Sequence, residues 1–264
     1  MMKKILYFLL LVFIFSPVCA EPLKINLVSV PEQKYKILAT EVTQELYEAV
    51  MGENPSFFKG KNLPVENVSW YDAIYFCNKL SEIQGLDPVY SSNGRTKIKN
   101  WNYKPHMGEK IKGGIEADTS KNGFRLPTLY EWSYCAIGGQ LEMGYLYSGS
   151  SNLDEIAWTS QNSDKTTHDV AGKKPNGYGL FDMNGNVFEW CYELGRNKID
   201  VFAANSIFNM SGEKIYCGGS YKSKEEDCVI DYFDGGYFGI VSKFYRREPV
   251  YYNKTIGFRI VAKN

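Results

Sequence analysis

The sequence predicts a single compact, loop-rich α+β domain, and three observations support this prediction. Helical signals are confined to the first half, where capping side chains precede apolar residues at helical spacing. After residue 140 no long helical period is visible, and short apolar runs alternate with Gly, Asn, Asp and Ser. The segment from Phe258 to Val261 then has the pattern of a terminal strand. Helices followed by short strands indicate an α+β fold, and no repeat or linker divides residues 23–264.

The first helix is predicted to begin after Thr43, whose hydroxyl can accept a hydrogen bond from the first turn. The apolar residues at helical spacing are Val42, Leu46, Ala49 and Val50. Gly52 and Pro55 are expected to end this helix.

The second helix begins at a capping box, in which Ser69 is followed three residues later by Asp72. Its predicted buried face consists of Ala73, Cys77 and Leu80, and it ends near Gly85. Residues 87–114 are polar and rich in Tyr, which favours a small hairpin excursion.

A second capping box, Thr128 with Glu131, begins the third helix. This helix carries Trp132, Cys135 and Ala136 and stops at the glycine pair 138–139. All strong helical signals therefore lie before residue 140.

The composition excludes several classes of protein. The chain has 264 residues, of which 44% are hydrophobic and 23% charged, and its formal net charge is zero. These values exclude a disordered chain, a coiled coil and a collagen-like fibre. A neutral chain has no surplus of Lys and Arg for phosphates, so nucleic-acid binding is not expected. Aromatic residues make up 15%, led by 20 Tyr, which suggests either well-anchored loops or a Tyr-rich recognition surface.

The N-terminal residues have the pattern of a secretory signal peptide. Met1–Lys4 is basic, and Ile5–Phe15 is an unbroken apolar run that is shorter than the about 20 residues needed to span a bilayer. Val18 and Ala20 are small residues at the −3 and −1 positions of a cut before Glu21. Residues 1–20 are therefore expected to be a signal peptide.

Two alternatives remain for this segment. It could stay uncut as an anchor, or a lipoprotein signal could be cut before Cys19, which would then be acylated. In every case the chain is expected to be exported to the periplasm, the cell surface or the extracellular space. Contact with a membrane is expected only through a lipid anchor at Cys19.

The cysteines are too few and too dispersed for a zinc site. Cysteines occur at positions 19, 77, 135, 191, 217 and 228. No C-x-x-C pair exists, which argues against a zinc knuckle, and two His in the chain exclude a His-rich metal site. Cleavage after Ala20 leaves an odd number, so at least one thiol stays unpaired. The simplest interpretation of Cys77 and Cys135 is a buried apolar thiol.

Four ordered motifs resemble those of one family. They are Asn67–Ala73, Gly123–Trp132, Asn176–Trp190, and Gly218–Tyr221 followed by Gly257–Arg259. This chain is similar to the formylglycine-generating enzyme (sulfatase-modifying factor) family from about residue 35 to the C-terminus. The resemblance implies a variant of the C-type lectin fold. It extends to exported bacterial members, including the variable proteins of diversity-generating retroelements.

The resemblance also locates the copper site of the enzymes. There, two Cys five residues apart hold a copper(I) ion that activates oxygen, and a substrate Cys becomes formylglycine. The two positions fall on Ser223 and Cys228, and the nearby residues match Ser220 and Trp190. A hydroxyl is a poor ligand for this soft ion, so copper and oxidase activity are not expected.

Several alternatives remain for the cysteines near this site. Cys191 or Cys217 could replace the missing copper ligand, or either could form a disulfide with Cys228. The favoured interpretation of Cys228 is a core thiol. Cys77 and Cys135 resemble one half of each disulfide of the animal enzyme, but the partner positions fall near Phe233 and on Ile260, so both should be inert buried thiols.

A calcium-binding turn of the enzymes matches Asn184, Gly185, Val187 and Glu189. Loop carbonyls and a carboxylate are suitable calcium ligands. Alternatively, Glu189 accepts hydrogen bonds from the loop. Arg125 and Arg259 are expected to have structural roles, pairing with loop carbonyls or carboxylates.

The C-terminal residues 222–254 are expected to form an exposed ligand-binding face. This segment interleaves Tyr, Asp, Gly and Ser with Phe, a composition of adaptable binding loops. The contact candidates are Tyr221, Tyr232, Tyr237, Phe238, Tyr245, Tyr251 and Tyr252. The alternative is that half of these aromatic side chains only pack the loop.

The function favoured by the sequence is therefore an exported, non-catalytic domain that presents this face to a protein or surface ligand. The first alternative is a copper-dependent formylglycine-generating oxidase that uses Cys228 although Ser223 replaces the first copper Cys. A purely structural envelope or accessory domain is the third possibility.

Overall fold

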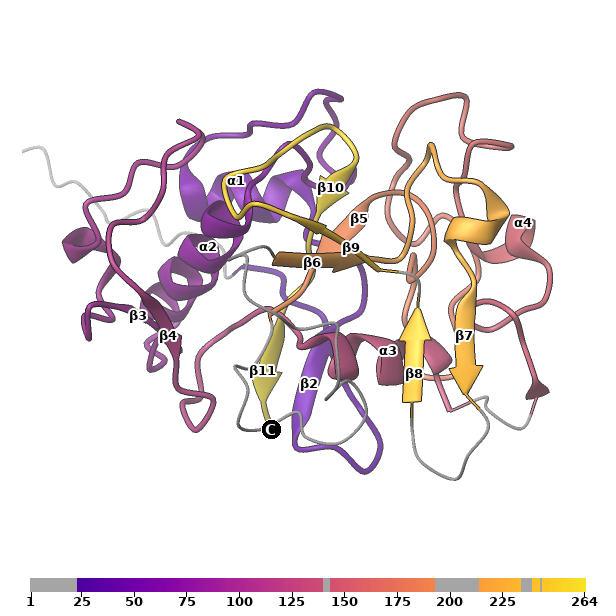
Figure 1. The fold of residues 1–264 in the computed structure, drawn as a ribbon, viewed down its shortest axis with the longest axis horizontal. Coiled ribbons are helices and arrows are strands. Elements are labelled where there is room, and N and C mark those ends of the chain that lie inside the picture. The colour runs from indigo at the N-terminus through magenta and orange to yellow at the C-terminus, as the bar shows by residue number, and fades with distance from the viewer. Residues whose placement is uncertain (1–22, 140–142, 193–213, 234–238, 243) are drawn as a thin grey trace, which may run out of the picture.

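Two small sheets lie at the centre of the fold (Figure 1). The computed structural model describes residues 23–264 except 140–142, 193–213, 234–238 and 243, and for residues 231–244 it describes the backbone alone. The first sheet has the order β1-β2-β11 and is antiparallel throughout. Its strands are Leu27–Ser29 (β1), Tyr35–Leu38 (β2) and Val261–Lys263 (β11). The expectations for residues 1–20 and Cys19 lie outside the described residues.

The second sheet has the order β10-β5-β6-β9 and positions the candidate site. Its strands are Ile256–Gly257 (β10), Phe188–Trp190 (β5), Lys214–Cys217 (β6) and Phe244–Arg247 (β9). β10 runs parallel to β5, and the other pairs are antiparallel. The register places Tyr216 opposite both Trp190 and Tyr245, so aromatic residues cross the sheet at one level.

Two hairpins extend from the centre. Tyr90–Ser92 (β3) pairs with Ile115–Ala117 (β4), and the excursion between them contains the 3₁₀ turn Ile98–Asn100 (η1). The predicted excursion is confirmed and extends three residues further. The second hairpin, Ile230–Phe233 (β7) with Gly239–Ser242 (β8), packs against the third helix.

The first helix spans Gln44–Met51 (α1) and begins as predicted. The Thr43 hydroxyl accepts a hydrogen bond from the Leu46 N–H at 3.2 Å, and the helix ends at Gly52 in the left-handed conformation. Ala49 is exposed, because α1 is buried through Leu46, Tyr47 and Val50. The expectation that Ala49 belongs to the buried face was therefore wrong.

The two predicted capping boxes are confirmed. Ser69 and Asp72 close the N-terminus of Trp70–Ile83 (α2), and Thr128 and Glu131 close that of Leu129–Ile137 (α3). α3 ends at Gly138 with φ +62°, a conformation that favours glycine. Two shorter elements follow, Leu153–Ile156 (α4) and the 3₁₀ turn Glu225–Asp227 (η3).

The prediction of a strand over Phe258–Val261 was wrong for all but its last residue, because only Val261 belongs to a strand. β10 ends at Gly257 and β11 begins at Val261, so the residues between them connect one sheet to the other. This connection still forms backbone hydrogen bonds, because the Phe258 carbonyl accepts from Val42 N and the Ile260 carbonyl from Leu38 N, both at 2.9 Å. An apolar run can therefore be hydrogen-bonded without forming one continuous strand.

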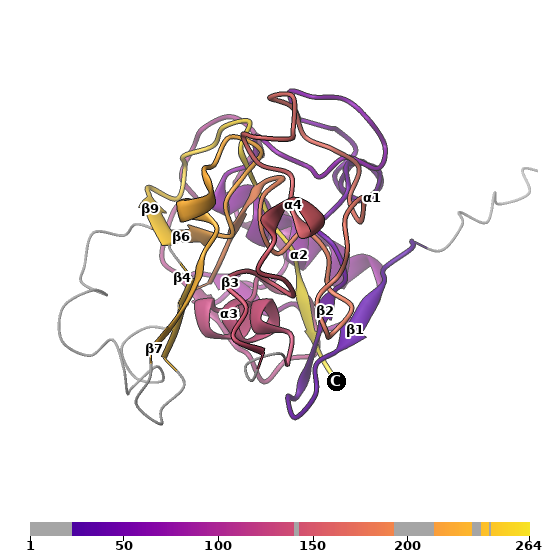
Figure 2. The ribbon, with the colours of Figure 1, turned by 90° about the vertical axis from the view of Figure 1, so that its right-hand side faces the viewer.

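The core is held by large aromatic side chains rather than by long strands. Trp70, Trp132 and Trp190 are at most 1% exposed, and each removes about 150–250 Å² from water. In Figure 2, β6, β7 and β9 lie on one side of the molecule, and α1, β1 and β2 lie on the other. Among the described residues, no helix is long and apolar enough to cross a membrane.

Candidate functional site

A glycine turn follows β6 and carries the residues that match the copper region of the enzymes. Gly218 and Gly219 have φ angles of +95° and +86°, which side chains rarely adopt. The turn then closes on itself, because the Ser220 N–H donates to the Ser223 Oγ at 3.0 Å and the Ser223 N–H donates to the Ser220 carbonyl at 2.9 Å. The two hydroxyl oxygens are 3.4 Å apart. Both serines thus serve the geometry of this turn.

Cys228 lies against the same turn. It follows η3, where its N–H donates to the Glu225 carbonyl at 2.9 Å. A Cβ atom added to Gly219 would lie 2.5 Å from the Cys228 Sγ and 3.6 Å from the Ser223 Cβ. The structure therefore brings together the two positions that match the copper ligands, and both side chains are buried.

These two side chains do not fit a copper(I) ion. A soft ion of this kind selects thiolates, and the second donor here is a hydroxyl that already accepts a hydrogen bond from Ser220. The alternative donors Cys191 and Cys217 pack instead in the apolar cluster around Trp132. The site is also closed, since Ser220, Ser223 and Cys228 are all at most 5% exposed.

Trp190, the remaining residue matched to the catalytic region, has a packing role in this structure. Its indole N–H donates to the Val68 carbonyl at 3.0 Å, which links β5 to the segment before α2. Its ring meets Tyr216 edge-on at 5.2 Å, and the side chain is fully buried.

The polar side chains matched to the calcium turn are already engaged by other groups of the protein. Both carboxylate oxygens of Glu189 accept hydrogen bonds from Arg259 at 2.7 Å, and one accepts a third from the Trp132 indole at 2.7 Å. The Asn184 side chain accepts from the Ser148 N–H and donates to the Cys228 carbonyl. Gly185 and Val187 donate their backbone N–H groups to Gly218 and Glu41. Within the described ranges, no group of three or more His, Cys, Asp or Glu could hold a metal.

The structural roles predicted for the two arginines are confirmed. Arg259 also donates to the carbonyls of Leu38 and Phe181, which joins three separate segments of the chain. Arg125 forms a two-pronged pair with Glu131 at 2.6 Å and donates to the Leu126 carbonyl. Such paired geometry is the strong form of a charge-assisted hydrogen bond.

Sequence reasoning missed two further carboxylates beside Arg259. Glu41 accepts from the Val187 N–H and the Asn186 amide, and Asp182 accepts from the Ala171 N–H at 2.7 Å. The Asp182 Oδ1 is buried and has no hydrogen-bond partner within the described structure. Burial raises the pKa of Asp182 to about 6, and it raises the pKa of Glu41 well above its usual value. Asp182 lies within the motif Asn176–Trp190, but Glu41 comes from a distant segment, so the sequence does not show that the two carboxylates meet beside Arg259.

The tyrosines predicted to contact a ligand lie in different environments. Tyr221 is fully buried with its ring edge-on to Phe58, so the expectation that it contacts a ligand is corrected. Tyr245 is partly buried, stacks on Tyr216 and donates its hydroxyl to Asp227 at 2.8 Å. The hydroxyl of partly buried Tyr251 accepts from Asn253, whereas Tyr252 is 41% exposed. The side chains of Tyr232, Tyr237 and Phe238 lie outside the described structure.

The excursion before β4 contributes to the same surface, which the sequence did not indicate. Lys110 pairs with Glu248 at 3.6 Å, and a Cβ added to Gly108 would lie 3.8 Å from the Tyr252 ring. Met107, the residue before Gly108, is 58% exposed. We call the surface formed by residues 102–112 and 245–252 the tyrosine–lysine face.

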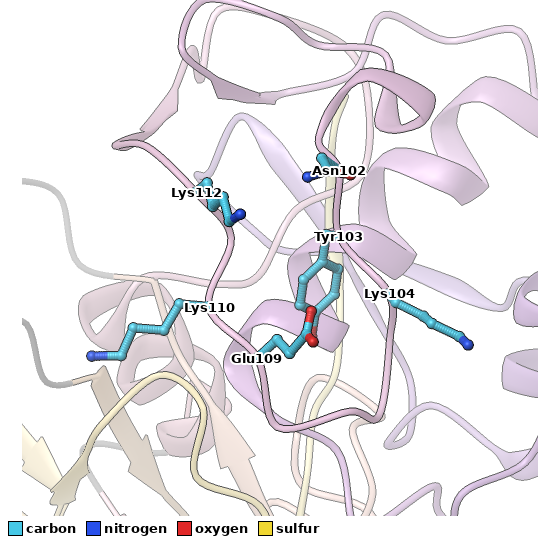
Figure 3. A pocket seen from close by; sticks show the side chains of 6 residues that line it. All are labelled: Asn102, Tyr103, Lys104, Glu109, Lys110 and Lys112. Carbon is cyan, nitrogen blue, oxygen red and sulfur yellow. The ribbon is translucent and has the colours of Figure 1, made fainter.

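A small cavity of about 240 Å³ lies within this face. It is lined by Asn102, Tyr103, Lys104, Glu109, Lys110 and Lys112 (Figure 3). The side chains of Tyr103 and Glu109 lie at its centre, whereas Lys104 and Lys110 point away on opposite sides. The Tyr103 hydroxyl donates to Asp72 at 2.8 Å, which anchors the cavity to the cap of α2.

Cys77 and Cys135 are fully buried thiols, as predicted. Burial raises the pKa of both, that of Cys135 to about 12, so neither forms a reactive thiolate near neutral pH. Cys191 and Cys217 are also buried, and their sulfur atoms are 3.6 Å apart.

Comparison with known proteins agrees with this architecture. The structure resembles Treponema denticola variable protein 1 with a TM-score of 0.71 and 32% identity, covering 91% of this chain and 92% of that one. It resembles the crystal structure of CarF with a TM-score of 0.62 and 28% identity, covering 87% and 86%. The chaperone protein LppX of Paenibacillus barcinonensis is 40% identical over 170 residues, which is 58% of this chain.

Coverage of the curated relatives is partial. The match spans 60% of the LppX protein and 40% of the formylglycine-generating enzyme of Mus musculus, which is 24% identical over 194 residues. The sequence-family model of the sulfatase-modifying factor enzyme 1-like domain matches residues 18–264 of this chain. Since that match covers nearly all of the sequence, the chain belongs to the sulfatase-modifying factor family of formylglycine-generating-enzyme-like domains.

Proposed function

We propose that this chain is an exported, non-catalytic member of its family that binds a ligand through the tyrosine–lysine face. The observation that carries the proposal is the closed turn at Ser220 and Ser223. One of the two thiolates required for copper(I) is replaced by a hydroxyl that serves the turn, and Cys228 is buried behind Gly219. A substrate cysteine would have no route to that thiol without opening the turn.

The location of exposed side chains supports the binding half of the proposal. Tyr252 and Met107 are exposed, and the Lys110–Glu248 pair joins the two segments that carry them. The Arg247 guanidinium lies 5.4 Å from the centre of the Tyr251 ring. Aromatic rings combined with charged side chains supply contact area and orientation at the same time. The overall likeness to a protein named as variable is consistent with a scaffold that displays side chains.

The charge of this face favours a ligand with acidic groups. Lys104, Lys110 and Lys112 are among the residues that line the cavity, and Glu109 is the acidic one among them. Lys110 is paired with Glu248, so Lys104 and Lys112 carry the excess positive charge there. Arg247 adds a further positive charge on β9 and is exposed. An acidic ligand would gain from this excess, and its affinity should fall with added salt.

The test uses purified residues 21–264 and three defined probes: sulfated dextran, poly-glutamate and neutral dextran. We expect binding of at least one acidic probe that weakens between about 50 and 200 mM salt, and no binding of the neutral one. Tyr252→Ala should weaken binding about tenfold. Tyr130→Ala is the matched control, because Tyr130 lies on α3 with the same 41% exposure. Equal effects of the two substitutions, or no binding of either acidic probe, would contradict the proposed face.

A further inference from the structure

We infer that Cys191 and Cys217 are a disulfide-forming pair that cross-links β5 to β6 when the chain meets a disulfide oxidant. Their sulfur atoms are 3.6 Å apart, and both side chains are fully buried. This pairing differs from the sequence-based alternatives, in which either cysteine would join Cys228. The inference does not depend on the proposed ligand-binding face, so a negative result for either proposal would not affect the other.

The strand register explains why the two thiols meet. Cys217 lies opposite Glu189, and the Cys191 N–H donates to the Ile215 carbonyl at 2.9 Å, which continues the β5–β6 ladder by one residue. Cys191 and Cys217 are therefore diagonal neighbours on one face of the sheet. A disulfide needs a sulfur–sulfur distance of about 2.05 Å, so the thiols must approach by about 1.5 Å. Rotation of both side chains, with a small shift at the end of β5, supplies this movement.

The other described cysteines have different neighbours. The Cys135 sulfur contacts the Tyr35 hydroxyl at 3.7 Å. Cys77 lies on α2 in the other large apolar cluster, and Cys228 packs with Tyr147 and Leu153. The 3.6 Å contact between the two sulfur atoms is therefore the observation that supports the pair 191–217.

The reaction is a thiol–disulfide exchange. One thiol loses its proton and attacks the oxidant, a small-molecule or protein disulfide, which releases one reduced thiol. The second thiolate then attacks the mixed disulfide and forms the 191–217 bond, releasing the other reduced thiol. Two S–H bonds are lost and one S–S bond forms, while the oxidant gains two electrons and two protons. The protein therefore needs no redox cofactor of its own.

Burial controls the rate of this exchange. Both thiols are 0% exposed, so an oxidant reaches them only when the β5–β6 ladder opens locally. Cys191 follows the last residue of β5, and opening there must release its N–H from the Ile215 carbonyl and its carbonyl from the Trp70 indole. We expect oxidation over minutes to hours rather than seconds. Once formed, the cross-link should raise the melting temperature by about 5–10 °C, because it restricts the unfolded chain.

The experiment uses reduced residues 21–264 incubated at pH 8 with oxidised glutathione, followed by alkylation and peptide mapping by mass spectrometry. The expected product is a peptide pair joined through Cys191 and Cys217, with a higher melting temperature that a reductant reverses. Cys228→Ser should keep both the cross-link and the temperature shift, whereas Cys217→Ser should lose both. The peptide map of the unaltered protein tests the pairing even if neither variant folds. The inference would be overturned if Cys191 and Cys217 were both still alkylated after prolonged oxidation, or if the cross-link contained Cys228.

Discussion

The backbone N–H of Ser220 donates a 3.0 Å hydrogen bond to the side-chain oxygen of Ser223. A thiol at position 223 would accept this hydrogen bond poorly, because sulfur is a weak acceptor. The Ser223 hydroxyl is therefore a good hydrogen-bond acceptor for closing the turn and a poor ligand for copper(I). The oxygen that replaces sulfur at position 223 therefore favours a closed turn, whereas the copper chemistry of the enzymes in the family needs a thiol there.

Replacing that atom should restore a copper site. In Ser223→Cys, two thiols flank Gly219, and we expect tight binding of one copper(I) ion per chain. The measurement is competition with a chromophoric copper(I) chelator under reducing conditions. The chelator should remove copper(I) from the unaltered protein. It should also remove the ion from the double variant that carries Ser223→Cys and Cys228→Ala. Equal copper retention by the unaltered protein would contradict the interpretation of Ser223.

Gly219 should not tolerate a side chain, because Cys228 fills the space beside it. Gly219→Ala combines a positive φ with a Cβ only 2.5 Å from the Cys228 sulfur, and we expect a loss of about 2–4 kcal/mol in unfolding free energy. Gly85→Ala is the control, since its φ is +67° but nothing lies within 4 Å of the added Cβ. Cys228→Ala should partly rescue Gly219→Ala in denaturant melts. A double-mutant cycle without coupling would show that the two residues do not press on one another.

The buried pair of Glu189 and Arg259 should be essential for stability. Glu189→Gln turns an amide donor towards the guanidinium and leaves its charge unpaired in the core, at a cost of about 3–5 kcal/mol. Glu155→Gln removes the exposed pair with Lys174 and should change stability by less than about 1 kcal/mol. Chemical denaturation measures both. Calcium-dependent stabilisation of the unaltered protein, lost in Glu189→Gln, would instead support the calcium turn.

The carboxyl of Asp182 should make stability depend on pH. Burial raises its folded pKa from 3.8 to about 6, so between these values the folded state holds more protons than the unfolded state. Unfolding free energy should therefore fall as pH rises from about 4 to 6, a change of roughly 2–3 kcal/mol.

Asp182→Asn provides the test of this dependence. Its amide oxygen can still accept from Ala171, and its NH₂ group can occupy the position of the unpartnered Oδ1. We expect a more stable protein at pH 7 and a flatter profile between pH 4 and 6. Glu41 has its own raised pKa, so part of the pH dependence should remain. Identical profiles for the variant and the unaltered protein would contradict the role of Asp182.

Local sequence signals predicted the helices well. Ser69–Asp72 and Thr128–Glu131 specify helix starts because every atom of a capping box comes from one turn of chain. Sheet order could not be predicted in this way. The residues around Phe258 leave one sheet and join the other, and that path depends on hydrogen bonds to Leu38 and Val42 far earlier in the chain.

The site residues show the same contrast between local motifs, which the sequence reveals, and contacts between distant segments, which it does not. The motif around Glu189 identified a carboxylate of importance, but Arg259, 70 residues later, occupies both its oxygens. Tyr221 follows the Gly218–Ser220 turn, and it is buried among distant segments of the chain, including the Phe58 ring and Ser163. Pairing of Cys191 with Cys217 required the β5–β6 register, which no spacing in the sequence specifies.

The central claim, that this domain binds without catalysis, is tested most directly on a substrate peptide. Residues 21–264, loaded with copper under reducing conditions, would be incubated with a Cys-x-Pro-x-Arg peptide, and the product would be read by mass spectrometry. We predict that the peptide cysteine stays unchanged, while Ser223→Cys under the same conditions at least retains the metal. Formation of an aldehyde by the unaltered protein, abolished by Cys228→Ala, would contradict the claim and make Ser223 a tolerated copper ligand.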